Sequence, residues 1–169
     1  MIEYIKGDLI KAFKKAEKAL LVHQCNLTVG MGAGIAKVIA DNFPEILEPD
    51  IKIRTKALER PEQCLGNTVL YHLGGQKVIA NVYSQYFPGN PNKVFDTFEQ
   101  RLHWLKLALE KFVYIYADSG ITFYMPLIAS GLAKQQNKKC YSDFDYFKKF
   151  IAPTIEEELK DFNVKVYYL

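Results

Sequence analysis

Short apolar runs alternate along the chain with segments in which apolar residues recur every three or four positions. This alternation of strand-like and helix-like segments predicts an α/β protein, a three-layer α/β/α sandwich with a mixed central sheet. One domain is expected over residues 1–169, because a chain of this length can bury a core of its own. The predicted strands are residues 2–6, 19–25, 68–73, 77–83, 121–125 and 164–169, and the predicted helices are residues 9–16, 35–43, 93–118 and 143–162.

Glycine and proline refine these boundaries. The adjacent glycines at 74–75 predict a hairpin between two strands. Residues 45–60 have a mixed pattern and are predicted to be irregular. Residues 113–117 fit either a strand or the end of a helix, and the helix is favoured because the apolar stripe continues through Tyr116. The last helix is expected to restart at Pro153, since proline is tolerated at a first helical position.

Composition and charge narrow the class of protein. The net charge of +3 is small, and no lysine or arginine cluster is dense enough to indicate a nucleic-acid partner. Cys25, Cys64 and Cys140 have unrelated spacings, so we expect neither a disulfide framework nor a metal site, and no cofactor. The chain has no signal-peptide layout and no apolar run approaching 18 residues. These features predict a cytoplasmic protein that does not enter a membrane.

A strand, a glycine-rich turn and a helix start follow one another over residues 23–37. Gly30, Gly32 and Gly34 form a G-x-G-x-G pattern. It differs from the dinucleotide fingerprint because residue 35 is Ile, and from the P-loop because no Gly-Lys-Ser/Thr follows. Glycines allow a ligand to approach the backbone closely, and the N–H groups of a helix start favour phosphate. The glycines alone leave both phosphate binding and a plain strand-to-helix turn open.

Three further segments are candidates for the same site. A loop of small residues at 127–133 follows a predicted strand, and two such loops at one sheet edge can hold a diphosphate through main-chain amides. Asp8 either caps the helix that follows or contacts a ligand. Residues 84–92, which include Tyr86 and Phe87, form either a wall of the ligand site or ordinary packed surface.

Five segments together resemble the macro domain family. They are residues 7–9 (GDL), 23–26 (HQCN), 30–36 (GMGAGIA), 79–85 (IANVYSQ) and 125–133 (MPLIASGLA). They span nearly the whole chain and are similar to the compact branch that contains the yeast-type ADP-ribose-1''-phosphate phosphatase and the terminal ADP-ribose glycohydrolase. Small stand-alone members occur in bacteria and phages, and for a phage-encoded protein the expected location is the host cytoplasm. The resemblance implies a pocket for ADP-ribose.

The resemblance also implies roles for individual residues. Asp8, beside the Leu9 backbone, would accept the adenine amino group, and Asn26 would bind the distal ribose. The two small-residue loops would cradle the diphosphate, and Tyr83 and Gln85 would lie near the ligand. The complete predicted ligand-binding set is Asp8, Leu9, Asn26, Gly32, Ala33, Gly34, Ile35, Tyr83, Gln85, Ala129, Ser130, Gly131, Leu132 and Ala133.

The family includes binding modules, glycohydrolases and phosphatases. The glycohydrolase branch carries a Lys in the strand that corresponds to residues 81–85 and an Asp where this chain has Ala133, and another hydrolase branch carries an Asp where this chain has Ala36. Because these residues are missing, the resemblance favours a phosphatase. His23 would then act as general acid–base, or as nucleophile, on the terminal phosphate, and Asn26 would position the ribose.

Each of these roles has an alternative. His23 also fits a buried strand histidine that is satisfied by a backbone carbonyl, and Cys25 is expected to pack rather than react. Three functions stay open: an ADP-ribose-1''-phosphate phosphatase, a binding module for ADP-ribose, and a glycohydrolase that removes ADP-ribose from protein or nucleic acid. The expected partners are ADP-ribose or its 1''-phosphate and ADP-ribosylated macromolecules. The chain is expected to act as a monomer.

Overall fold

The computed structural model describes residues 1–92 and 94–169, and over these residues six strands form one mixed sheet in the order β1-β6-β5-β2-β4-β3. β1, β6, β5, β2 and β4 run parallel to one another, and β3 runs antiparallel to β4. The predicted mixed sheet is confirmed. The strands are β1 (Ile2–Lys6), β2 (Lys18–Asn26), β3 (Thr68–Gly74), β4 (Gln76–Gln85), β5 (Thr122–Pro126) and β6 (Asn163–Tyr168).

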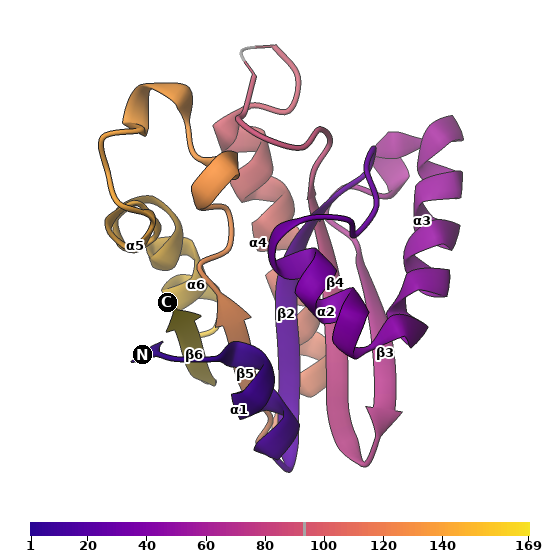
Figure 1. Cartoon of the computed structure of the whole chain (residues 1–169), viewed down its shortest axis with the longest axis vertical. Coiled ribbons are helices and arrows are strands. Elements are labelled where there is room, and N and C mark those ends of the chain that lie inside the picture. Colours follow the sequence, from indigo (N-terminus) through magenta and orange to yellow (C-terminus); the bar gives the residue numbers. More distant parts are fainter. Residues whose placement is uncertain (93) are drawn as a thin grey trace.

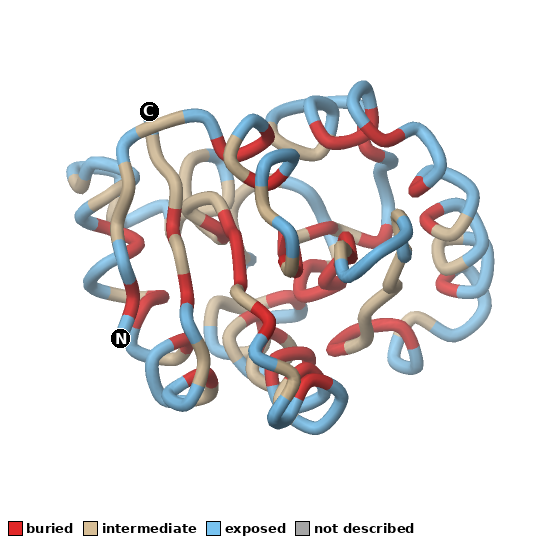
Figure 2. The backbone as a smooth tube through the Cα atoms, turned by 90° about the horizontal axis from the view of Figure 1, so that it is seen from below, coloured by how far each residue is buried: buried red, intermediate tan, exposed pale blue. Residues whose placement is uncertain are grey.

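Helices cover both faces of this sheet (Figure 1). Phe13 of α1 and Ile39 of α2 are fully buried on one face, while Phe112 of α4 and Ile155 of α6 are fully buried on the other. Figure 2 shows the buried residues gathered along the strands and the inward sides of the helices. The α-helices are α1 (Leu9–Lys15), α2 (Gly34–Asn42), α3 (Leu47–Glu59), α4 (Phe98–Tyr116), α5 (Asp143–Tyr146) and α6 (Ala152–Glu158).

The two central strands separate toward their carboxyl ends. β2 pairs with β5 over Ala19–Leu21, whereas its pairing with β4 continues as far as Asn26. β5 in turn continues along β6 as far as Pro126. Beyond Leu21 the strands therefore follow different partners, and the sheet divides at the edge where the two small-residue loops begin. In open α/β sheets such a division at the carboxyl edge is the usual place for a ligand.

The prediction that residues 45–60 are irregular is wrong, because they contain the 13-residue helix α3. A helix is usually recognised by an apolar stripe. In α3 one of the two buried positions is the carboxylate of Asp50, and the other is the small side chain of Ala57. The buried side of α3 therefore lacks the apolar stripe from which a helix is predicted.

The helix predicted over 93–118 is confirmed as α4, with a later start. Its first residue is Phe98, because the Thr97 side chain and Gln100 form a capping box there. The predicted start near Lys93 lies outside the described residues. The helix ends at Tyr116, so the strand alternative for 113–117 is excluded.

The helix predicted over 143–162 is interrupted. One π-helical turn, Phe147–Ile151, lies between α5 and α6, and Pro153 stands in the first turn of α6 as expected. Proline has no N–H to donate to the turn before it, so the hydrogen-bond ladder changes register there. In the part of the chain that the structure describes, no helix combines the length and apolar character needed to cross a bilayer.

Gly66 provides a test of the fold. Its φ is +74°, and a Cβ built there would lie 3.0 Å from Cδ1 of Leu107 on α4. Gly75 has a φ of +60° with nothing within 4 Å of such a Cβ. Gly66→Ala should lower the free energy of unfolding by about 2–3 kcal/mol and Gly75→Ala by about 1 kcal/mol, because both strain the backbone and only the first adds a clash. Urea denaturation measures both, and equal losses would contradict the packing of Gly66 against α4.

Candidate functional site

A cleft of about 1090 Å³ opens where β2 and β5 separate. The structure brings both small-residue loops to it, together with the segment that follows β1. Gly32, Tyr83 and His23, in contrast, do not line it among the described residues. The predicted ligand-binding residues that do line it are Asp8, Leu9, Asn26, Ala33, Gly34, Ile35, Gln85, Ala129, Ser130, Gly131, Leu132 and Ala133.

The first loop ends in an uncapped helix. Ala33 is the N-cap of α2 and makes no side-chain capping hydrogen bond, and Gly34 has a φ of +55°. The first N–H groups of any helix lack intrahelical acceptors, and alanine is among the poorest capping residues. The start of α2 therefore presents main-chain donors and the positive end of its dipole to the cleft.

Asn26 shapes the entry to this loop. Its Oδ1 accepts the main-chain N–H groups of Thr28, at 3.1 Å, and Val29, at 2.7 Å. This Asx turn uses the carbonyl oxygen of the side chain and leaves the amide nitrogen for a ligand. Asn26 is therefore held in a fixed orientation at the wall of the cleft.

The second loop carries backbone strain. Ala129 has a φ of +57° and Gly131 a φ of +65°, so the left-handed region is occupied twice within three residues. This conformation is unfavourable for alanine, and non-glycine residues held in it concentrate at ligand sites. The short 3-10 helix Gly131–Ala133 follows and keeps the loop turned toward the cleft.

Asp8 follows β1, and the strand order places β6 and β5 between it and the end of β2 at Asn26. Its Oδ1 accepts the N–H of Lys11 at 2.9 Å, so the capping interpretation is confirmed, and the residue also lines the cleft. Phe144 and Tyr168 line the same cleft, with ring centroids 4.6 Å apart. Neither ring was predicted to line the site, because each lies in an element whose apolar pattern also fits the core. A carboxylate beside aromatic rings suits a purine base.

The expected catalytic role of His23 does not fit its position. The side chain has no exposed surface, and its Nε2 lies 2.5 Å from Oδ1 of Asn81. Cys25 lines the cleft, and its Sγ lies 3.7 Å from Nδ1 of His23, so the ring lies behind Cys25. The alternative of a buried strand histidine describes it better, with the Asn81 side chain and the Gln24 backbone as its partners.

Burial also controls the protonation of this pair. Desolvation lowers the pKa of His23 to about 4, although the Asn81 hydrogen bond and the Asp50 carboxylate oppose the change. Desolvation likewise raises the pKa of Cys25, and the Asp50 carboxylate adds to that increase. His23 is therefore neutral at pH 7 and Cys25 is a thiol, which agrees with the expected packing role of Cys25.

Tyr83 and Gly32 are also placed differently from the expectation. Tyr83 is fully buried, and its hydroxyl donates to Oδ1 of Asp50 at 2.5 Å, so it supports α3 from behind the cleft. Gly32 is exposed, and its N–H turns back to the carbonyl of Gly30 at 2.8 Å. Neither residue faces the cleft.

The loop at residues 84–92 lines the cleft through Gln85, Pro88 and Gly89 rather than through its aromatic rings. Tyr86 packs edge-on against Phe87, at 4.6 Å between ring centroids, and against Phe95, at 5.0 Å. The aromatic side chains of this loop therefore pack against one another as ordinary surface and do not form a wall of the ligand site. The backbone of the loop still forms part of the rim.

A buried ion pair fixes this rim. Asp96 accepts the N–H groups of Tyr86 and Phe87, each at 3.1 Å, and pairs with Arg101 at 2.5 Å. Arg101 also donates to the carbonyl of Gly89 at 2.7 Å. Side-chain exposure is 4% for Arg101 and zero for Asp96, so the pair is shielded from water. The rim is therefore anchored without a ligand.

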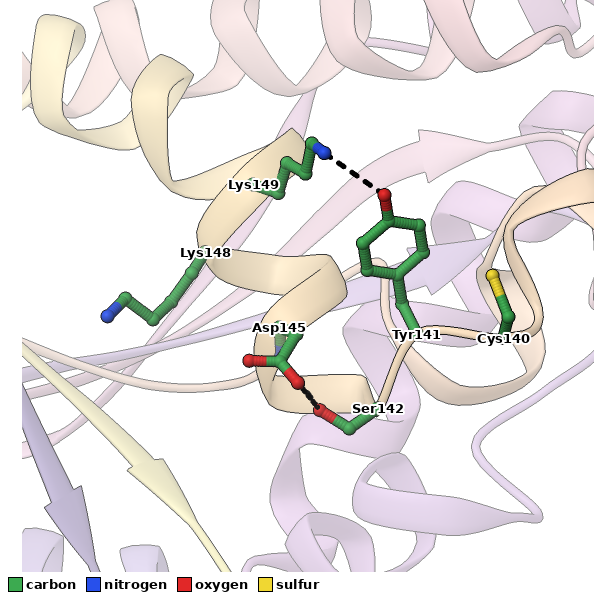
Figure 3. A pocket seen from close by; sticks show the side chains of 6 residues that line it. All are labelled: Cys140, Tyr141, Ser142, Asp145, Lys148 and Lys149. Carbon is green, nitrogen blue, oxygen red and sulfur yellow. Dashed lines mark hydrogen bonds between the residues drawn. The ribbon is translucent and has the colours of Figure 1, made fainter.

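A second hollow, of about 460 Å³, lies along α5 and the π turn. Lys149 donates to the hydroxyl of Tyr141 at 3.0 Å, whereas Lys148 lies 5.4 Å from the ring centroids of Tyr4 and Phe144. Figure 3 shows the two lysines pointing away from each other. They do not converge on one anion. In the described part of the chain, no group of three His, Cys, Asp or Glu side chains could hold a metal ion.

No family model matches the chain. An uncharacterized 17.5 kDa protein from the tk-vs intergenic region of Enterobacteria phage T4 is 31% identical over 140 residues, which are 79% of this chain and 81% of that protein. The ADP-ribose 1''-phosphate phosphatase of the yeast Meyerozyma guilliermondii is 33% identical over 69 residues, which are 41% of this chain and 39% of the yeast protein. The chain thus spans less than half the length of that yeast relative.

Two solved structures share the fold. A macrodomain protein from Streptomyces coelicolor superimposes with a TM-score of 0.71 at 16% identity, over 100% of this chain and 99% of that chain. Thermosipho africanus DarTG in complex with ADP-ribose superimposes with a TM-score of 0.62 at 16% identity, over 98% of this chain and 41% of that chain. The α/β/α architecture is therefore that of a macrodomain.

The buried His23 makes stability depend on pH. Its pKa is about 4 in the folded chain and about 6.5 when unfolded, so only the unfolded state takes up a proton between these values. The free energy of unfolding should fall by up to about 3 kcal/mol as pH drops from 6.5 to 4. His23→Gln should flatten this part of the curve, and His72→Gln, at an exposed histidine, should leave it unchanged. Urea denaturation at several pH values measures the slope, and an equal slope in His23→Gln would contradict the neutral buried ring.

Proposed function

This chain belongs to the macrodomain family, and from that premise we propose that its cleft binds ADP-ribose. The observation that carries the proposal is the meeting of two loops at one cleft. The uncapped start of α2 and the strained loop around Ala129 both line it. Main-chain donors from two sides suit a diphosphate, which is the centre of the ADP-ribose molecule.

The two ends of the cleft suit the two ends of this ligand. At one end, Asp8 is available to accept the adenine amino group beside the rings of Phe144 and Tyr168. At the other end, the amide nitrogen of Asn26 is available to the hydroxyls of the distal ribose. The diphosphate then lies between them, next to Gly34 and Ala129. A solved structure of DarTG holds ADP-ribose, which supports this ligand.

Removal of the terminal phosphate of ADP-ribose-1''-phosphate is the second candidate function. It is supported by the name of the yeast relative from Meyerozyma guilliermondii. Because His23 lies behind Cys25, a phosphate in the cleft would meet Asn26, Gln24 and Arg54 rather than an imidazole. Hydrolysis here would need a water molecule positioned by such groups, whereas binding needs nothing beyond the main-chain donors.

The uncapped helix allows a direct test of binding. Ala33→Asp supplies the missing N-cap, so it should raise the free energy of unfolding by about 1 kcal/mol. The same carboxylate would repel the diphosphate and compete for its donors, so ADP-ribose affinity measured by calorimetry should fall at least about tenfold. Asn42→Asp adds an equal charge at the far end of α2, outside the cleft, and should leave affinity unchanged. Failure of the unaltered chain to bind ADP-ribose at millimolar concentration would refute the proposal.

The second candidate function has its own measurement. The chain is incubated with ADP-ribose-1''-phosphate, and released phosphate is followed over time. If turnover occurs, His23→Gln should keep most of it, because the buried ring does not reach the cleft. Loss of turnover with intact ADP-ribose binding would restore the catalytic role expected from the sequence. No release by any form would leave binding as the function.

A further inference from the structure

Arg54 is a cleft residue that the sequence analysis did not single out. Within residues 1–92 and 94–169, no other lysine or arginine lines the cleft. Helix α3 brings its guanidinium to the end of β2, where Nη1 donates to the main-chain carbonyl of Asn26 at 2.5 Å. If Asn26 holds the distal ribose, as the proposed function requires, the cation lies at the distal-ribose end.

The charge of Arg54 is anchored from behind. Asp50 accepts from Nε at 2.7 Å and from Nη2 at 3.0 Å, and its carboxylate also receives the Tyr83 hydroxyl at 2.5 Å. Asp50 is 1% exposed and does not line the cleft, whereas Arg54 does. The carboxylate therefore faces the interior with its oxygens occupied. A group in the cleft meets the guanidinium first.

Arg54 keeps hydrogen-bonding capacity for a ligand. A guanidinium has five N–H groups, and the contacts to Asp50 and Asn26 account for three of them in the described structure. One N–H remains on each terminal nitrogen. The side chain is 13% exposed, so water screens it weakly and a charge-assisted bond there is strengthened.

We propose that Arg54 makes the cleft select an ADP-ribose that carries a phosphomonoester on its distal ribose over unsubstituted ADP-ribose. The inference rests on the proposed function, since it assumes that ADP-ribose occupies the cleft. Main-chain N–H groups hold the diphosphate, which is present in both ligands. The additional phosphate, present in only one ligand, meets the fixed cation beside Asn26. Arg54 is therefore a specificity-determining residue.

The test compares two ligands by calorimetry, ADP-ribose and ADP-ribose-1''-phosphate, at a temperature and time at which no phosphate is released. The unaltered chain should bind the phosphorylated ligand at least about tenfold tighter. Arg54→Gln should bring this ratio close to one while changing ADP-ribose affinity less than about threefold. Arg60→Gln removes the same charge just beyond α3 and outside the cleft, so it should keep the full ratio.

Removing Arg54 leaves the Asp50 carboxylate buried without its cation, which can unfold the chain. The double variant Asp50→Asn, Arg54→Gln avoids this, and thermal unfolding checks each variant. An unchanged ligand ratio in a folded Arg54→Gln or double variant would overturn the proposal. An equal loss of affinity for both ligands would also overturn it, because it would show that Arg54 only supports Asn26. Absence of ADP-ribose binding in the unaltered chain would instead refute the proposed function.

Discussion

The parallel alignment of five strands is the constraint on which the site depends. Parallel strands place their carboxyl ends at one sheet edge, so the loops after β1, β2, β4 and β5 all emerge there. The loss of pairing between β2 and β5 beyond Leu21 then separates two of these loops. The cleft is the space between them. Its position follows from strand order, and its chemistry from which residues stand at the strand ends.

Polar side chains support this cleft from behind, where an apolar core would be the simpler solution. Asp50, Arg54 and Tyr83 link α3 to β4, and the chain of contacts continues through Asn81 to His23 on β2. Buried polar groups are costly unless each has a partner, so the arrangement constrains geometry more than it adds stability. It fixes where α3 stands, and through Arg54 it fixes the carbonyl of Asn26. Removing any one member would take away at least one of the hydrogen bonds that its buried neighbours make.

Much of the architecture follows from local patterns. The strands, the hairpin at 74–75 and helix α4 were predictable because apolar periodicity and turn residues act over short distances. It was also predictable that the two small-residue loops are neighbours, because parallel strands place their carboxyl ends, and the loops that follow them, at one sheet edge. Helix α3 was not, because its buried positions are held by Asp50 and Ala57. The burial of His23 was not predictable either. It depends on residues far along the chain, such as Asn81 of β4, which lies against the ring.

The buried ion pair that fixes the rim of the cleft bears on the rate of ligand binding. Asp96 and Arg101 hold the backbone around Gly89 through hydrogen bonds that do not involve a ligand. The shape of this part of the entrance is therefore set by hydrogen bonds within the chain itself. Binding at an entrance that is held in this way is governed by diffusion and orientation, and the lifetime of a complex is governed by the contacts inside.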